Sequence, residues 1–172
     1  MFDTVLIAGL GLMGGSMAKT IKARTLSRVL GWNRTRATAE QALADGSIDA
    51  IATEALYKEA DLVIIGLYPQ ATVDWLLENM SKMKKGCVIV DMVGVKQFMV
   101  DHLEQAALDA GVHYVGGHPM AGREFSGLDF ALSTLFDGAS MIFVPTKSST
   151  ERVLEQLEAY FMSLGFGQTV RC

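Results

Sequence analysis

The sequence predicts an α/β protein with a doubly wound, mostly parallel sheet of the Rossmann type. Short apolar runs rich in β-branched residues alternate along the chain with longer stretches of helical spacing, as expected for strand–helix–strand units. Runs such as "DLVIIGLYP" (61–69) are apolar on both faces, which is typical of strands covered by helices on both sides of a sheet. The length suits one well-filled domain, and we expect residues 1–172 to form it.

Each predicted strand is an apolar run that ends at a glycine, a proline or a polar turn. The first run, "TVLIAGLG", ends in a glycine turn, and the last, "GQTVRC", begins a strand at the end of the printed sequence. In chain order the predicted strands are residues 4–11, 28–33, 50–53, 61–69, 87–92, 113–120, 140–145 and 167–172.

The predicted helices lie between these strands, and their limits follow from stop and start signals. Gly46 ends the second helix, Gly111 ends the fifth, and either Ser148 or Ser149 is the expected N-cap of the last. In chain order the predicted helices are residues 13–24, 36–45, 56–60, 72–83, 96–110 and 149–164.

Composition argues against several classes of protein. The net charge is −4 and no basic stripe occurs, so we expect no nucleic-acid partner. The apolar N-terminus carries Asp3 and breaks at Gly9, so it is interpreted as a buried strand rather than a signal peptide. No apolar run approaches the ~20 residues of a membrane helix. Cys87 and Cys172 suit neither a disulfide framework nor a metal site, so we expect a cytoplasmic protein with reduced thiols and no metal.

The stretch "GLGLMGGSM" after the first strand predicts a dinucleotide site. Gly9 permits a tight turn, Gly11 lets the backbone approach a pyrophosphate, and Gly14 lets the helix pack closely on the strand. Leu12 and Met13 begin that helix, whose N–H groups and dipole favour an anion. These five residues are therefore expected to bind the cofactor.

The end of the second strand, "GWNRTR", predicts NADP(H) rather than NAD(H). An acidic residue there would hydrogen-bond the 2′-hydroxyl of NAD, whereas Asn33, Arg34 and Thr35 offer no carboxylate, and the last two suit a 2′-phosphate. Gly66, Leu67, Tyr68 and Pro69 lie at the end of the fourth strand, where they would line the nicotinamide half of the cofactor. The alternative interpretations are a solvated helix start for Arg34 and a surface aromatic for Tyr68.

The stretch "GGHPMAGREFSG" (116–127) lies at the carboxyl end of the sixth strand. His118 is a candidate base or hydrogen-bond acceptor near the nicotinamide, because its unperturbed pKa lies near neutrality, and Glu124 is a candidate polar partner. A lone histidine is often structural, so chemistry alone leaves this role open. His102 and His113 are expected at the surface.

Three ordered motifs resemble the prephenate and arogenate dehydrogenases of tyrosine biosynthesis. They are "GLGLMGGSMAKTIK", "VIVDMVGVK", which resembles D-x-x-S-V-K, and H-P-M-A-G-x-E-x-S-G from His118 to Gly127. The resemblance implies oxidative decarboxylation of prephenate or arogenate, with hydride transfer from the carbinol carbon to the nicotinamide of the cofactor. It implies that His118 accepts a hydrogen bond from the reacting hydroxyl and that Glu124 lies in the substrate pocket.

The chain departs from the family pattern at Gly94, where the motif has a serine. One hydrogen bond to the substrate or nicotinamide is therefore missing or supplied by water. Lys96 is interpreted either as a residue at the start of a helix or as a cation that helps to bind an anionic substrate. Arg123 is the other nearby cation, and Ser126 belongs to the motif, so these four residues are the candidate substrate contacts.

The resemblance also implies a longer protein. Family members continue into a helical domain that dimerises and supplies cations for the substrate, whereas this sequence ends at Cys172. We expect the nucleotide-binding half of a homodimeric enzyme, with a small-molecule substrate and little turnover by this half alone. A β-hydroxyacid-type dehydrogenase and a non-catalytic NADP-binding module are the alternatives.

Overall fold

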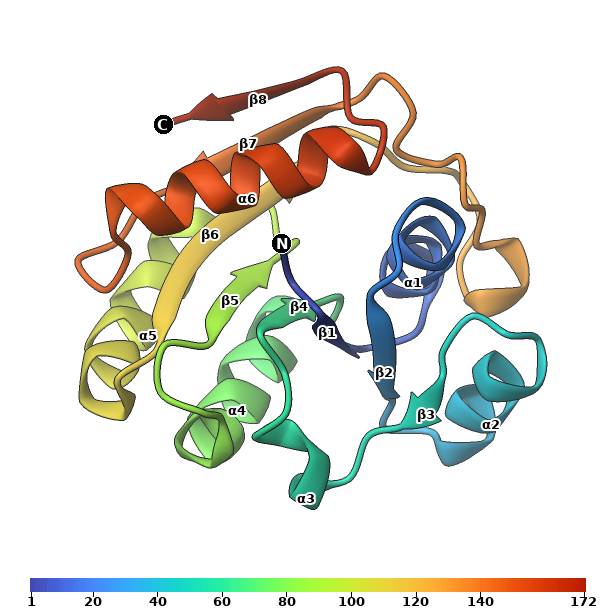
Figure 1. Cartoon of the computed structure of the whole chain (residues 1–172), viewed down its shortest axis with the longest axis horizontal. Coiled ribbons are helices and arrows are strands. Elements are labelled where there is room, and N and C mark those ends of the chain that lie inside the picture. Colours follow the sequence, from blue (N-terminus) through green and yellow to red (C-terminus); the bar gives the residue numbers. More distant parts are fainter.

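A computed structural model describes all residues, 1–172, and confirms the predicted fold class (Figure 1). Eight strands form one sheet in the order β3-β2-β1-β4-β5-β6-β7-β8. All neighbouring strands are parallel except β6 and β7. The strands are β1 Thr4–Ala8, β2 Arg28–Trp32, β3 Ala50–Ile51, β4 Leu62–Ile65, β5 Val88–Asp91, β6 His113–Pro119, β7 Ser140–Val144 and β8 Gln168–Arg171.

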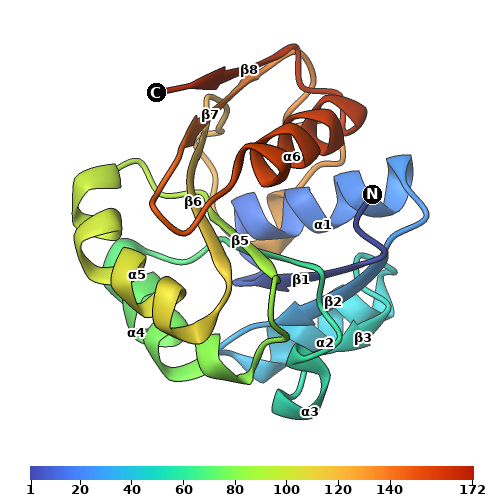
Figure 2. The same ribbon diagram turned by 60° about the vertical axis from the view of Figure 1, so that its left-hand side comes forward.

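Helices cover both faces of the sheet, with α1 and α6 on one side and α4 and α5 on the other (Figure 2). Each face of the sheet has its own hydrophobic core, and alternate residues of a strand belong to different cores. Ile64 belongs to the core formed with α1, α2 and α6, whereas Val63 and Ile65 belong to the core formed with α3, α4 and α5. The helices are α1 Leu12–Arg24, α2 Arg36–Ala44, α3 Glu54–Tyr57, α4 Pro69–Asn79, α5 Lys96–Ala110 and α6 Glu151–Ser163, with 3₁₀ turns η1 Met80–Lys82 and η2 Leu128–Phe130.

The fourth helix begins earlier than its apolar spacing predicts. It starts at Pro69 instead of Thr72, because proline is well suited to the first helical position, where its missing N–H costs nothing. It ends at Asn79 and continues as the 3₁₀ turn η1. The β4 strand ends at Ile65, so Gly66, Leu67 and Tyr68 form the turn between β4 and α4.

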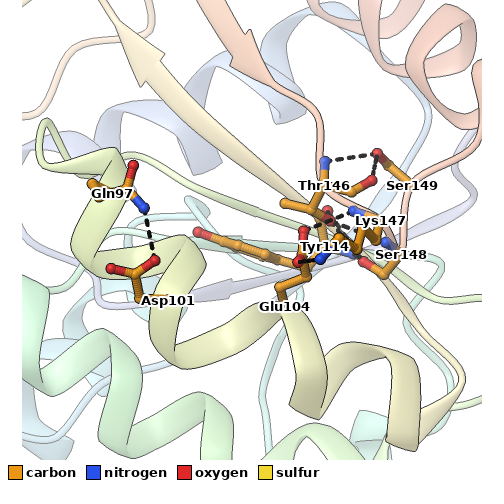
Figure 3. Close-up of polar contacts among 8 residues, drawn as sticks. All are labelled: Gln97, Asp101, Glu104, Tyr114, Thr146, Lys147, Ser148 and Ser149. Carbon is orange, nitrogen blue, oxygen red and sulfur yellow. Dashed lines mark hydrogen bonds and ion pairs between the residues drawn. The ribbon is translucent and has the colours of Figure 1, made fainter.

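The expected N-cap of the last helix was wrong. Thr150 caps α6 by accepting a hydrogen bond from the Val153 N–H, and the helix starts at Glu151. The two serines serve the preceding turn instead (Figure 3): the Ser149 hydroxyl accepts from Thr146 N–H, and the Ser148 hydroxyl accepts from Tyr114 N–H.

The same turn changes the interpretation of His113, which was expected at the surface. His113 is the first residue of β6, is half-buried, and places Nδ1 2.6 Å from the Ser148 carbonyl oxygen. His102 is exposed on α5, as expected. Cys87 is buried in the core, where burial raises the pKa of its thiol to about 12. No helix combines the length and apolar character needed to cross a membrane.

Candidate functional site

A cavity of about 620 Å³ runs along the carboxyl ends of the parallel strands. The turns after β1, β2, β4 and β5 and the loop after β6 surround it, as is usual for ligand sites of open α/β sheets. Of the residues predicted from the sequence, it is lined by Gly9, Gly11, Leu12, Met13, Asn33, Arg34, Tyr68, Pro69, Gly94 and Ser126. Gly66 and Leu67, which were also expected at the end of the fourth strand, line it as well. The remaining lining residues, which the sequence did not single out as binding residues, are Ala71, Met92, Val93, Val95, Phe125 and Gly127.

The glycine turn is a close approach of three backbone segments. Gly9 has φ +92°, and a Cβ there would lie 2.7 Å from the Gly66 carbonyl oxygen. A Cβ at Gly14 would overlap the Gly9 carbonyl oxygen. Gly11 has open space where a Cβ would stand, on the side of the cavity. Gly9 and Gly14 are therefore required by packing, and the Gly11 backbone is bare toward the cavity.

The first turn of α1 is suited to hold an anion. Its N-cap, Gly11, supplies no side-chain hydrogen bond, and the first turn carries no acidic residue. The N–H groups of this turn thus have no side-chain acceptor, and the helix dipole adds positive potential there. These residues fit the pyrophosphate of a dinucleotide.

The side chains of the turn after β2 differ in role: one holds the turn in place, and another is free at the cavity. Asn33 accepts from Leu10 N–H at 2.9 Å and donates to the Thr35 carbonyl at 3.0 Å, so it joins the two turns. Arg34 is exposed, lines the cavity and has no ion pair. Thr35 is the N-cap residue of α2, but its hydroxyl makes no cap hydrogen bond. Arg34 therefore keeps its donors available at this end of the cavity, whereas Thr35 is exposed next to it and does not line the cavity.

His118 lies next to the end of β6, half-buried and against Gly94. A Cβ at Gly94 would stand 3.3 Å from Cε1 and 3.6 Å from Nδ1 of the imidazole. Nδ1 is buried and has no hydrogen-bond partner. Since Gly94 itself lines the cavity, the imidazole lies immediately behind that wall, with one ring nitrogen unsatisfied.

A buried charge network holds the wall in place. Asp91 is fully buried at the end of β5, where it pairs with the Lys96 ammonium and accepts from the Tyr114 hydroxyl at 2.6 Å. Its Oδ1 also accepts from Val93 N–H, within the turn that carries Gly94. Burial lowers the pKa of Lys96 while Asp91 opposes the shift, and burial raises the pKa of Tyr114. The Lys96 ammonium is thus bound inside the protein and does not line the cavity.

The remaining charged residues predicted for the site lie outside the cavity. Arg123 donates to the Phe130 carbonyl at 2.9 Å, and its guanidinium lies 5.2 Å from the centroid of the Phe125 ring. Glu124 is exposed. Neither side chain lines the cavity, although Phe125 and Ser126, which follow them directly in the chain, do.

The segment after β6, residues 121–133, is fixed to the helix that starts at the glycine turn. Gly15 of α1 leaves room for Leu128, because a Cβ there would lie 2.7 Å from the leucine Cδ1. The Ser16 hydroxyl accepts from Leu132 N–H at 3.0 Å, and the Thr20 hydroxyl donates to the Ser133 carbonyl at 3.1 Å. The sequence signal for this contact is Gly15, the fourth glycine of "GLGLMGGS" (9–16), followed by the small hydroxyl residue Ser16.

The comparisons with known proteins agree with this geometry. A family model described as prephenate dehydrogenase, nucleotide-binding domain, matches residues 17–168. The chain is 38% identical to prephenate dehydrogenase of Bacillus subtilis (strain 168), over 92% of this chain and 43% of that protein. The chain thus spans less than half the length of that relative.

Two solved structures share the fold. Synechocystis arogenate dehydrogenase superposes with a TM-score of 0.88 at 25% identity, covering 98% of this chain and 59% of that one. Prephenate dehydrogenase from Aquifex aeolicus, in complex with hydroxyphenyl propionate and NAD⁺, gives 0.83 at 23% identity, covering 100% and 60%. The recognised resemblance is confirmed.

Asp91→Ala should destabilise the protein by about 3–5 kcal/mol, because it leaves the Lys96 ammonium buried without a partner. Urea unfolding of the chain measures this. The double variant Asp91→Ala/Lys96→Met removes both charges and should recover most of the loss. A loss below about 1 kcal/mol in the single variant would show that the ammonium reaches water at little cost.

Proposed function

The chain belongs to the prephenate dehydrogenase family, whose nucleotide-binding domain it matches, and from this we propose a function for residues 1–172. They form one dinucleotide-binding Rossmann domain that holds NADP and provides the catalytic histidine for oxidative decarboxylation of prephenate or arogenate. The observation that carries the proposal is the position of His118, behind Gly94 at the wall of the cavity that begins at the glycine turn.

The reaction mainly requires that the protein orient the substrate and accept the proton of its hydroxyl group. In the substrate, hydride leaves the carbinol carbon, the carboxylate departs as carbon dioxide, and its bond electrons complete the aromatic ring. The bound nicotinamide supplies the hydride acceptor. His118 accepts the hydrogen bond of the carbinol hydroxyl, which becomes more acidic as the C–O bond gains double-bond character. General-base help of this kind contributes about 10²–10⁴-fold.

We propose NADP(H) as the preferred cofactor. The end of β2 has no carboxylate to repel a 2′-phosphate, and the donors of Arg34 and Thr35 are available beside the cavity. The N–H groups at the start of α1 hold the pyrophosphate. Tyr68, whose side chain is 85% exposed, and Pro69 line the same cavity after β4.

The substrate's negative charge is met by groups outside this chain's cavity, since the nearby Lys96 and Arg123 are engaged elsewhere. We propose that these cations come from the part of the relatives' length that this chain does not span. The whole protein would then be a cytoplasmic homodimer, and the choice between prephenate and arogenate would depend on that part.

Family membership argues against the β-hydroxyacid-type alternative, because the match includes the stretch with His118 and Glu124. A non-catalytic NADP-binding module remains an outcome of the experiments. It would bind NADPH without turnover in every form of the protein offered both substrates.

NADPH should bind this chain more tightly than NADH, as measured by fluorescence titration. Arg34→Ala should weaken NADPH binding by about 10- to 100-fold and leave NADH nearly unchanged, because a charge-assisted hydrogen bond to the 2′-phosphate is lost. Arg36→Ala is the matched control, since Arg36 is paired with Glu40. Equal or tighter binding of NADH to the unmodified chain refutes the preference.

His118→Asn should lower turnover by about 10²–10⁴-fold, because the acceptor for the hydroxyl proton is lost. The measurement is dinucleotide reduction by a form of the protein that turns prephenate or arogenate over. NADPH affinity should stay within about twofold, and His102→Asn, on exposed α5, should change neither quantity. Unchanged turnover in His118→Asn would end the proposed role.

Gly94→Ser should raise turnover about fivefold, because its hydroxyl would reach the unpartnered Nδ1 and fix the imidazole tautomer. Gly94→Ala adds the same Cβ without the oxygen and should give no gain. An equal gain in both variants, or no gain in either, would show that the open Nδ1 does not limit the reaction.

A further inference from the structure

A second cavity, of about 310 Å³, adjoins the cavity described above. The two share Gly11, Asn33 and Gly127, so they adjoin beside the glycine turn, and together we call them the groove. The second cavity extends toward α2, through Thr38 and Gln41. Under the proposed function, on which this inference rests, that is the end of the groove that receives the adenosine ribose.

A carboxylate stands at this end of the groove, although the sequence has none at the end of β2. Asp129, on the turn η2, lines the second cavity. Gln41 of α2 donates a hydrogen bond to its Oδ1 at 2.6 Å. The two residues are 88 positions apart in the sequence, and the segment near residue 130 lies close to α1 and α2 in Figure 1.

The position of Asp129 is fixed by its neighbours. Leu128, directly before it, is buried against Gly15 of α1. Gln41 holds one carboxylate oxygen and leaves the other available. On the other side, Phe130 donates its N–H to the Gly127 carbonyl and accepts from Arg123, so the backbone on both sides of Asp129 is held.

We propose that Asp129 is a cofactor-specificity residue. Its carboxylate accepts a hydrogen bond from a hydroxyl of the adenosine ribose and repels a 2′-phosphate in the same place. Its negative charge counteracts the attraction of a 2′-phosphate to Arg34, the cation that lines the adjoining cavity without an ion pair. Of the other charges of this region, Arg36 and Glu40 pair with each other, and Arg123 donates to the carbonyl of Phe130, the residue after Asp129. The preference for NADP set by Arg34 and Thr35 is thereby limited, and NAD also binds.

The experiment compares the affinities of this chain for NADP⁺ and NAD⁺ by calorimetric titration. Asp129→Asn should tighten NADP⁺ binding about fivefold, because one negative charge near the 2′-phosphate is removed. NAD⁺ affinity should stay the same or fall within about twofold. Gln41→Glu, which adds a negative charge beside Asp129, should weaken NADP⁺ binding relative to NAD⁺.

Asp101→Asn is the matched control. Asp101 is exposed and accepts from Gln97 at 2.7 Å on α5, the same kind of contact, and it lines neither cavity (Figure 3). It changes the net charge equally and should leave the ratio of the two affinities unchanged. Thermal melting checks that all variants are folded.

The outcomes separate the two proposals. If neither dinucleotide binds the unmodified chain, the proposed function fails. If both bind and Asp129→Asn leaves the affinity ratio unchanged, or shifts it no more than Asp101→Asn does, the specificity role fails and the proposed function stands. A shift toward NADP⁺ in Asp129→Asn, with the opposite shift in Gln41→Glu, supports the specificity role.

Discussion

The site depends on the contact between bare backbone at Gly9, Gly14 and Gly66. A Cβ at Gly14 would overlap the Gly9 carbonyl oxygen, and a Cβ at Gly66 would stand 3.0 Å from the Gly14 backbone. This contact seats the start of α1 against the ends of β1 and β4, and so places the helix N–H groups at the cavity. A larger residue at any of the three positions would move α1, and the loop packed on α1 would move with it.

Local patterns were enough to predict most of the fold. Apolar runs and glycine stops found all eight strands and the limits of α5, since those signals lie within each element. The N-cap Thr150, the environment of His113 and the antiparallel entry of β7 were not found. These features depend on hydrogen bonds such as that between Tyr114 N–H and Ser148, 34 residues apart, which no local spacing encodes.

The same distinction holds for the site. The positions of the glycine turn and of Arg34 at the cavity could be predicted from the sequence, because the order of strand, turn and helix determines where such residues lie. The position of the Lys96 side chain could not be predicted in this way. Its ammonium pairs with the carboxylate of Asp91, which is fully buried at the end of β5. A buried carboxylate needs a cation and hydrogen-bond donors, and Lys96 and Tyr114 supply them. The Lys96 ammonium thus stabilises the wall at Gly94 and does not supply a free cation to the cavity.

The contact of the 121–133 segment with α1 lets one helix position the walls of two cavities. The start of α1 offers N–H groups to a pyrophosphate, and one turn later Gly15 and Ser16 fix the backbone at Leu128 and Leu132. Phe125 and Ser126 precede this anchor and line the first cavity, whereas Asp129 follows Leu128 and lines the second. Displacing Leu128 would therefore disturb both cavities at once, because a single anchored turn places groups in each. The position of Asp129 at the second cavity and that of Phe125 and Ser126 at the first are consequently linked through packing on one face of α1.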